Sequence, residues 1–114
     1  MHLYGISNCD STGKARKWLK DHAIDYRFHD YRSDGLDAGL IEHLEAAAGW
    51  EALLNRRSAS WRRLSESERS NLNREKAMRL MLEHPTLIKR PLLETGSVLL
   101  VGFADEQYRS VVGS

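Results

Sequence analysis

The chain has 114 residues, of which 17 are basic and 16 acidic, so its formal net charge is +1. This length predicts one domain with a hydrophobic core, and the balanced charge does not favour nucleic acid or a membrane surface as a partner. The sequence holds one cysteine, which excludes an intramolecular disulfide. The first nine residues are too short and polar for a signal peptide, and no apolar run approaches the ~20 residues of a membrane span, so we expect a cytoplasmic protein.

The first third of the chain predicts a strand, a helix and a second strand. Residues 2–6 and 24–31 alternate in the manner of β-strands. Between them, a turn-like loop at 7–13 offers several N-cap residues, and a helix is predicted from Lys14. Its apolar residues share one face: Ala15, Trp18, Leu19 and Ala23. A strand, helix and strand within 31 residues predict two parallel strands.

The middle of the chain, about residues 36–83, is predicted to be mostly helical. The spacing of apolar residues predicts a helix over 36–48 that Gly49 ends, and a short helix over 50–54. A further helix start is expected at 65–68, where acidic residues suit the positive end of the helix dipole, followed by a helix over 73–82.

The last part returns to β-structure. Residues 86–94 predict a short strand, a proline turn and another strand, 97–103 the next strand, and 105–112 a closing helix. The order is therefore βαβ, a helical insert, then ββα, which predicts one α/β domain over 1–114. This order matches the thioredoxin fold and is also compatible with an unrelated small α/β sandwich.

Cys9 is the first candidate for chemistry. It follows a strand and precedes a helix, where backbone N–H groups and the helix dipole lower a thiol pKa, and Lys14 could add positive charge. The alternative is an inert, half-buried cysteine. Thr12 stands where a C-x-x-C pair would have its second cysteine. An outside thiol must therefore resolve any disulfide that Cys9 forms.

Two arginine-containing segments are the other candidates. Pro91 could be a cis-proline that packs beside the cysteine loop and brings Arg90 near Cys9, or an ordinary turn proline beside a solvated arginine. The segment 55–63 carries four arginines around Trp61, and could bind phosphate or nucleic acid or be a solvated basic loop. The five histidines show no metal-ligand spacing, so we expect no metal site.

Three segments together resemble one family. Residues 4–10, which include Asn8-Cys9-Asp10, and residues 14–19 resemble the opening of the ArsC/Spx family. Residues 54–61 resemble its central arginine segment, and 85–92 its arginine and cis-proline segment. The order of the segments is also that of the family, and the Asn-Cys-Asp loop is most similar to the branch called YffB.

This resemblance implies a thioredoxin-like core with a helical insert. In arsenate reductases of the family, the loop cysteine attacks arsenate, arginines hold the oxyanion, and glutathione or glutaredoxin resolves the adduct. By the same resemblance, Cys9 is the nucleophile and Arg57 is the central arginine, or Arg56 with a shift of one residue. Arg90 and Pro91 match the arginine and cis-proline, and Asn8 and Lys14 are expected to join them in binding the substrate.

Two departures from the family pattern decide between its activities. Gly13 and Val98 stand where arsenate reductases carry arginines, so two positive charges that an oxyanion would need are missing. The resemblance therefore implies a glutathione-dependent thiol reductase with glutathione as co-substrate and no bound cofactor. The alternatives are an arsenate reductase-like oxyanion reductase and an Spx-like regulator that binds RNA polymerase, although Thr12 removes the C-x-x-C switch of such regulators.

Overall fold

The computed structural model describes residues 1–96 and 98–112 of the chain. These residues form two compact units: one of residues 1–35 and 90–112, and a helical one of residues Leu36–Lys89. In the described part of the chain, no helix is both long and apolar enough to cross a membrane.

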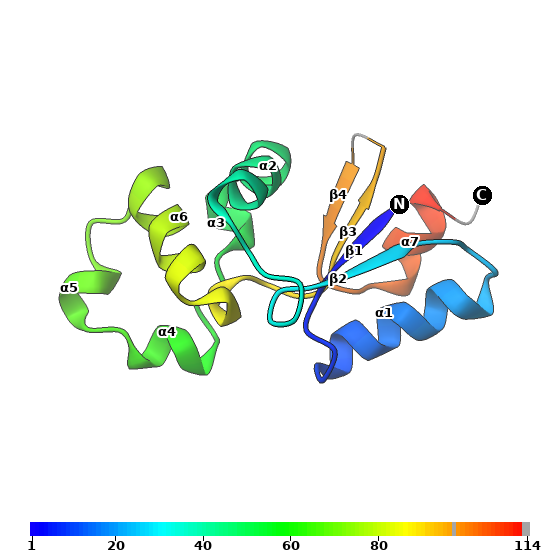
Figure 1. Ribbon diagram of the computed structural model, residues 1–114, viewed down its shortest axis with the longest axis horizontal. Helices are drawn as coiled ribbons and strands as arrows, with labels where there is room; N and C mark the ends of the chain where they lie inside the picture. The colour runs from blue at the N-terminus through cyan, green and yellow to red at the C-terminus, as the bar shows by residue number, and fades with distance from the viewer. Residues whose placement is uncertain (97, 113–114) are drawn as a thin grey trace. The chain divides into compact units, whose positions relative to one another are not determined.

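A four-stranded sheet with the strand order β2-β1-β3-β4 forms the centre of the first unit (Figure 1). Strand β1 pairs parallel with β2 and antiparallel with β3, and β3 pairs antiparallel with β4. The βαβ and ββα halves of a thioredoxin-like fold are thereby confirmed. The strands are β1 (His2–Gly5), β2 (Arg27–Asp30), β3 (Leu92–Thr95) and β4 (Val98–Val101). Ser97, predicted in the last strand, lies outside the described residues.

Helices α1 (Asp10–Asp21) and α7 (Asp105–Val111) cover one face of this sheet (Figure 1). The Trp18 indole Nε1 donates to Asp105 Oδ1 at 3.0 Å, and its ring meets that of Tyr108 edge-on at 5.4 Å. The buried residues of this core are Leu3, Ala15, Trp18, Leu19, Leu93 and Tyr108. Burial of this apolar surface fixes both helices against the sheet.

Helix α1 begins at Asp10, so the prediction of a helix starting at Lys14 was wrong by one turn. Cys9 is the N-cap residue, with extended backbone, and the Gly13 N–H donates to the Cys9 carbonyl at 2.9 Å. The small polar residues between them are typical of loops, but they also suit a first helical turn, where Asp10 faces the positive end of the dipole.

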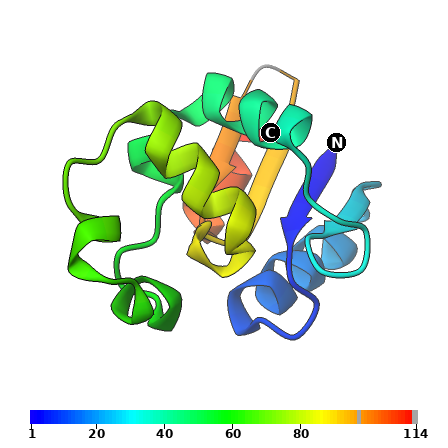
Figure 2. The same cartoon turned by 60° about the vertical axis from the view of Figure 1, so that its left-hand side comes forward.

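The second unit consists of short helices (Figure 2). They are α2 (Ala38–Ala48), α3 (Trp50–Leu53), α4 (Ala59–Arg63), α5 (Glu66–Arg69), α6 (Arg74–Glu83) and the 3₁₀ helix η1 (Pro85–Leu87). Side chains cap most of their N-termini: Asp37, Ser58, Ser65 and Asn73 each accept a backbone N–H. Ser65 and Glu68 complete a capping box, as expected of a helix start with acids in its first turn.

Two segments of this unit differ from what their sequences suggest. Segment 55–63, for which a solvated basic loop is one of two interpretations, ends in helix α4, because Ser58 caps it. The strand predicted at 86–88 is replaced by η1, with Pro85 at its start, where the fixed φ of proline favours a helical turn. Ile88 alone pairs in a β-bridge, with Leu54.

Candidate active site around Cys9

Three segments of the first unit meet at one edge of the sheet. Cys9 follows the carboxyl end of β1, and Tyr31 follows the carboxyl end of β2, which is parallel to β1. Arg90 and Pro91 precede β3, whose amino end lies at the same edge because β3 runs antiparallel to β1. The Arg90–Pro91 peptide bond is cis, as the resemblance implied, and the Pro91 carbonyl accepts the Gly102 N–H at 2.8 Å.

The Cys9 thiol lies among hydrogen-bond donors. Cys9 is half-buried, and burial alone would raise the pKa of its thiol. Hydrogen bonds from the Thr12 backbone, the Arg90 side chain, the Thr12 hydroxyl and the Ser11 backbone outweigh burial and hold the pKa of Cys9 below its ordinary value. Each of these donors is stronger toward a thiolate than toward a thiol. The arrangement therefore favours the nucleophilic form of cysteine.

Thr12 has a larger part in this site than the sequence indicated. Its side chain is fully buried, and its hydroxyl has no hydrogen-bond partner of standard geometry among the described residues, although it lies close enough to Cys9 to lower the thiol pKa. Gly5 makes room for it, since a Cβ at Gly5 would lie 2.6 Å from Thr12 Oγ1. A hydroxyl one helical turn after an N-cap cysteine is a signal that sequence reading could have used.

Asp30 holds the loop before Cys9 by a hydrogen bond. Its carboxylate is 7% exposed and accepts the Ser7 N–H at 3.0 Å through Oδ2 and the Arg32 N–H at 2.7 Å through Oδ1. Burial would raise the pKa of Asp30, but these backbone hydrogen bonds hold it below its usual range. The carboxylate is therefore ionised at neutral pH and joins the end of β2 to the segment before Cys9.

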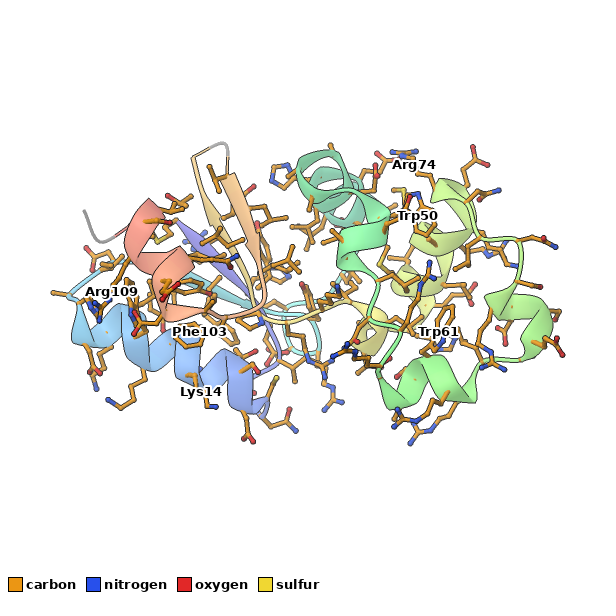
Figure 3. All side chains as sticks on the ribbon, turned by 180° about the vertical axis from the view of Figure 1, so that it is seen from behind. Lys14, Trp50, Trp61, Arg74, Phe103 and Arg109 are labelled. Atoms are coloured by element: carbon orange, nitrogen blue, oxygen red, sulfur yellow. The ribbon has the colours of Figure 1, made fainter. Side chains whose placement is uncertain are left out.

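A shallow hollow of about 490 Å³ opens beside Cys9 on the α1 side. Two of the predicted binding residues, Asn8 and Lys14, line it with Cys9, and both are exposed. Figure 3 shows Lys14 near the beginning of α1. The first unit therefore brings together five of the predicted site residues at or beside the same edge: Asn8, Cys9, Lys14, Arg90 and Pro91.

Arg57 lies in the helical unit, where it lines a separate hollow of about 430 Å³ with Arg56, Lys89 and three further residues. The Arg57 N–H donates to Asn55 Oδ1 at 3.0 Å, which fixes its backbone. The Arg56 guanidinium stacks over the Trp61 ring at 5.7 Å, so the two neighbouring arginines are held differently. A role for Arg57 in binding the substrate stays a prediction.

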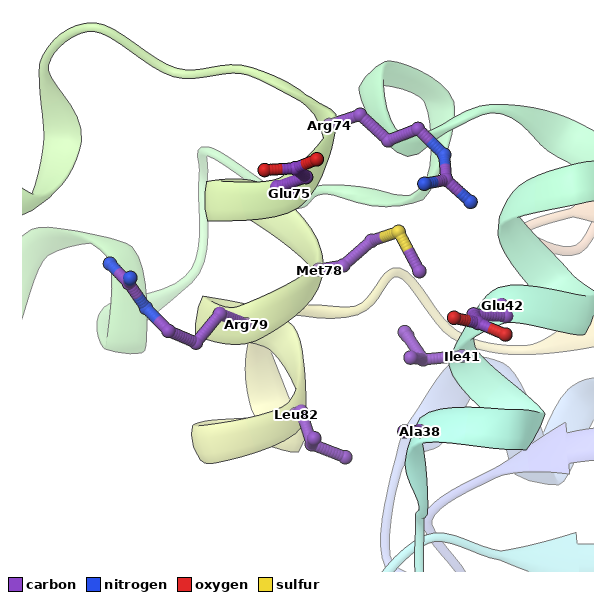
Figure 4. Close-up of a pocket in the computed structure, with 8 residues that line it drawn as sticks. All are labelled: Ala38, Ile41, Glu42, Arg74, Glu75, Met78, Arg79 and Leu82. Atoms are coloured by element: carbon purple, nitrogen blue, oxygen red, sulfur yellow. The ribbon is translucent and has the colours of Figure 1, made fainter.

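Another hollow of the helical unit lies between α2 and α6 (Figure 4). Ile41 and Met78 give it an apolar floor, and charged residues such as Glu42 and Arg79 stand at its rim. It contains no nucleophile. Among the residues that the structure describes, no group of three or more His, Cys, Asp or Glu side chains could hold a metal ion.

The two positions that depart from the arsenate reductase pattern both face solvent. Gly13 is exposed, and a Cβ there would meet no atom within 4 Å. Val98 is 41% exposed. Neither residue supplies a positive charge, and nothing in the packing at Gly13 prevents a longer side chain.

Comparison with known proteins adds to this geometry. An uncharacterized protein of Haemophilus influenzae is 44% identical over 108 residues, 95% of each chain. A global transcriptional regulator Spx of Enterococcus faecalis is 30% identical over 112 residues, which are 94% of this chain and 82% of the relative. The solved structure of a protein named YFFB is 42% identical with a TM-score of 0.92 and covers 97% of each chain.

A second solved structure, an arsenate reductase related protein from Brucella melitensis, is 48% identical with a TM-score of 0.78, covering 96% of this chain and 91% of the other. The model of the ArsC family matches residues 4–111, which include the Cys9 loop, the central arginines and the Arg90–Pro91 segment. Sequence, fold and site thus agree, and the chain belongs to the ArsC family, in its YffB branch.

Proposed function

We propose that this protein is a glutathione-dependent thiol–disulfide reductase in which Cys9 is the only nucleophile. The observation that carries the proposal is the set of donors around the sulfur, from Ser11, Thr12 and Arg90, which lowers the pKa of Cys9. A thiolate at this half-buried position can attack a disulfide that reaches the edge of the sheet.

The reaction needs two exchanges. The Cys9 thiolate attacks the glutathione sulfur of a mixed disulfide, a Cys9–glutathione disulfide forms, and the substrate sulfur leaves with the electron pair as a thiolate. A second glutathione thiolate then attacks the glutathione sulfur on Cys9, which releases oxidised glutathione and returns the Cys9 thiolate. Thr12 stands where an internal resolving cysteine would be, so the second exchange requires an external thiol.

Arg90 supports glutathione as that thiol. Its guanidinium already hydrogen-bonds the Cys9 sulfur, and a planar cation at this place suits one carboxylate of glutathione. Lys14, which lines the hollow beside Cys9, suits a second carboxylate. A tripeptide with two separated carboxylates matches such a spread of cations better than a compact oxyanion does.

The decisive experiment is reduction of a glutathione mixed disulfide by the purified protein, with glutathione and glutathione reductase present. We expect turnover that is lost in Cys9→Ser, and mass spectrometry should show one glutathione adduct per chain after treatment with oxidised glutathione. Arg90→Gln should slow adduct formation by roughly tenfold, because one charge-assisted hydrogen bond is lost. Absence of both adduct and turnover in the wild type would exclude this function.

Two other functions follow from named relatives. The Brucella melitensis relative supports an oxyanion reductase, and the exposed Gly13 and Val98 count against it, because neither provides the expected charge. The Spx relatives support a regulator, for which binding of purified RNA polymerase is the direct test. A regulator would bind the polymerase and show no mixed-disulfide turnover.

A further inference from the structure

Among the residues that the structure describes, three buried hydroxyl groups have no hydrogen-bond partner of standard geometry: those of Thr12, Tyr31 and Tyr108. Buried polar groups are normally paired, and an unpaired one costs stability and calls for an explanation. Thr12 lies beside the Cys9 sulfur, which accounts for its hydroxyl. Tyr31 lies at the same edge of the sheet, and no such neighbour explains its unpaired hydroxyl among the described residues.

Tyr31 is held firmly at this edge. Its backbone N–H donates to the Gly5 carbonyl at 2.9 Å, so it lies next to the end of β1, from which the Cys9 loop departs. Its side chain is 2% exposed, and its ring lies 6.4 Å from that of His29. Asp30, the preceding residue, binds the Ser7 N–H of the same loop. The backbone thus sets Tyr31 against the nucleophile loop from the neighbouring strand.

Tyr4 and Arg90 are the groups whose charges act on the Tyr31 hydroxyl. Burial raises the pKa of Tyr31, Tyr4 raises it further, and the positive charge of Arg90 lowers it. Tyr4 directs its own hydroxyl to Glu94 Oε1 at 3.1 Å, and an arginine carries donors and no acceptor. Two groups that can donate, the Tyr31 hydroxyl and the Arg90 guanidinium, thus belong to residues at the same edge of the sheet as Cys9, and an anionic oxygen bound there would find two donors.

Tyr108 shows that an unpaired tyrosine hydroxyl alone does not make such a place. It packs in the core between the sheet and helix α1, edge-on to Trp18 at 5.4 Å and to Phe103 at 4.9 Å. Burial is the only cause that raises its pKa, and no cation takes part. Tyr31 differs from this purely structural case by its position at the Cys9 edge and by the charge of Arg90.

We propose that Tyr31 is a specificity-determining residue of the Cys9 site, whose hydroxyl donates, together with Arg90, to an anionic oxygen of the molecule that reacts with Cys9. The inference rests on the proposed function and adds to it the requirement for an anionic substrate. Because the hydroxyl is enclosed, the oxygen reaches it only as the side chains at this edge adjust, and Arg90, on its flexible stem, is the one best able to move. The oxygen could belong to a carboxylate of a disulfide or to an inorganic oxyanion.

The test compares Tyr31→Phe with the matched control Tyr108→Phe. For each protein, three rate constants of Cys9 are measured: with oxidised glutathione, with the neutral bis(2-hydroxyethyl) disulfide, and with iodoacetamide. In Tyr31→Phe the rate with oxidised glutathione should fall roughly fivefold to tenfold, while the two neutral reagents react as in the wild type. Tyr108→Phe should leave all three rates unchanged, and both variants should unfold at an equal or higher urea concentration.

A separate arm uses inorganic phosphate, which needs no disulfide chemistry. Weaker protection of Cys9 from iodoacetamide by phosphate in Tyr31→Phe than in the wild type would support the proposal and show that a free oxyanion suffices. A fall with oxidised glutathione without any phosphate protection would also support it and assign the oxygen to a carboxylate of the disulfide. If the wild type reacts with neither disulfide, the proposed function fails. The role of Tyr31 is then decided by whether phosphate protects Cys9 from iodoacetamide less well in Tyr31→Phe than in the wild type. Equal behaviour of Tyr31→Phe and the wild type with every anion that binds, or no anion binding at all, would overturn the proposal.

Discussion

Thr12→Val removes one hydroxyl beside Cys9 and preserves the shape of the side chain. A hydrogen bond to a charged acceptor contributes ~1.5–3 kcal/mol and one to a neutral acceptor ~0.5–1.5 kcal/mol. With allowance for the half-buried position of Cys9, the hydroxyl should favour thiolate over thiol by about 1 kcal/mol, which is roughly a fivefold change in the thiolate fraction below the pKa. The Thr12 backbone N–H remains and keeps part of the effect.

The assay is the rate of iodoacetamide alkylation as a function of pH. We expect the midpoint to move to higher pH in Thr12→Val, with a slower rate near neutrality and the same plateau at high pH. Thr12→Ser, which keeps the hydroxyl, should follow the wild-type profile. Since the Thr12 hydroxyl has no hydrogen-bond partner of standard geometry in the described part of the chain, Thr12→Val should unfold at the wild-type urea concentration or above it. An unchanged pH profile in Thr12→Val would show that the backbone and Arg90 alone lower the Cys9 pKa, and would refute the role given to the hydroxyl.

Three further changes test other parts of the site. Gly5→Ala places a Cβ 2.6 Å from Thr12 Oγ1, so it should lower the free energy of unfolding by ~1–3 kcal/mol in urea titrations and slow the alkylation of Cys9. Wild-type values of both quantities would contradict the close packing of Thr12 against Gly5. Asp30 has a lowered pKa when folded, so the stability that its carboxylate adds is present above the unfolded pKa of ~3.9 and is lost as the pH falls through the folded pKa. The difference in urea midpoint between wild type and Asp30→Asn should therefore be large at pH 7 and shrink below about pH 4, and a constant difference would disprove this linkage. Arsenate turnover should be near background in the wild type and rise when Gly13→Arg and Val98→Arg are combined, and robust wild-type turnover would refute the argument from missing charge.

The order of elements could be predicted from the sequence because it rests on local periodicity. Alternation in the first and second strands and the apolar face of α1 were visible in short windows, and they predicted the parallel pair correctly. The start of α1 was missed because residues 10–13 have a composition typical of loops. The 3₁₀ helix that begins at Pro85 was missed because Thr86, Leu87 and Ile88, which follow this proline, also suit a strand.

The site was only partly predictable for a different reason. Cys9, Arg90 and Pro91 belong to segments that resemble a family, so their roles could be expected before their positions were known. Asp30 hydrogen-bonds Ser7 in the loop before Cys9, 23 residues away, and Tyr31 lies at the same edge because its backbone N–H pairs with the Gly5 carbonyl of β1. Such a pairing depends on which strand lies beside which, and neither residue type announces it.

The Asp30 carboxylate also connects two segments that are distant in the sequence. One of its oxygens accepts the Ser7 N–H and the other accepts the Arg32 N–H, so a single side chain links the turn after β2 to the loop before the nucleophile. The position of the loop before Cys9 therefore depends on the turn after β2, and not on the loop's own sequence alone.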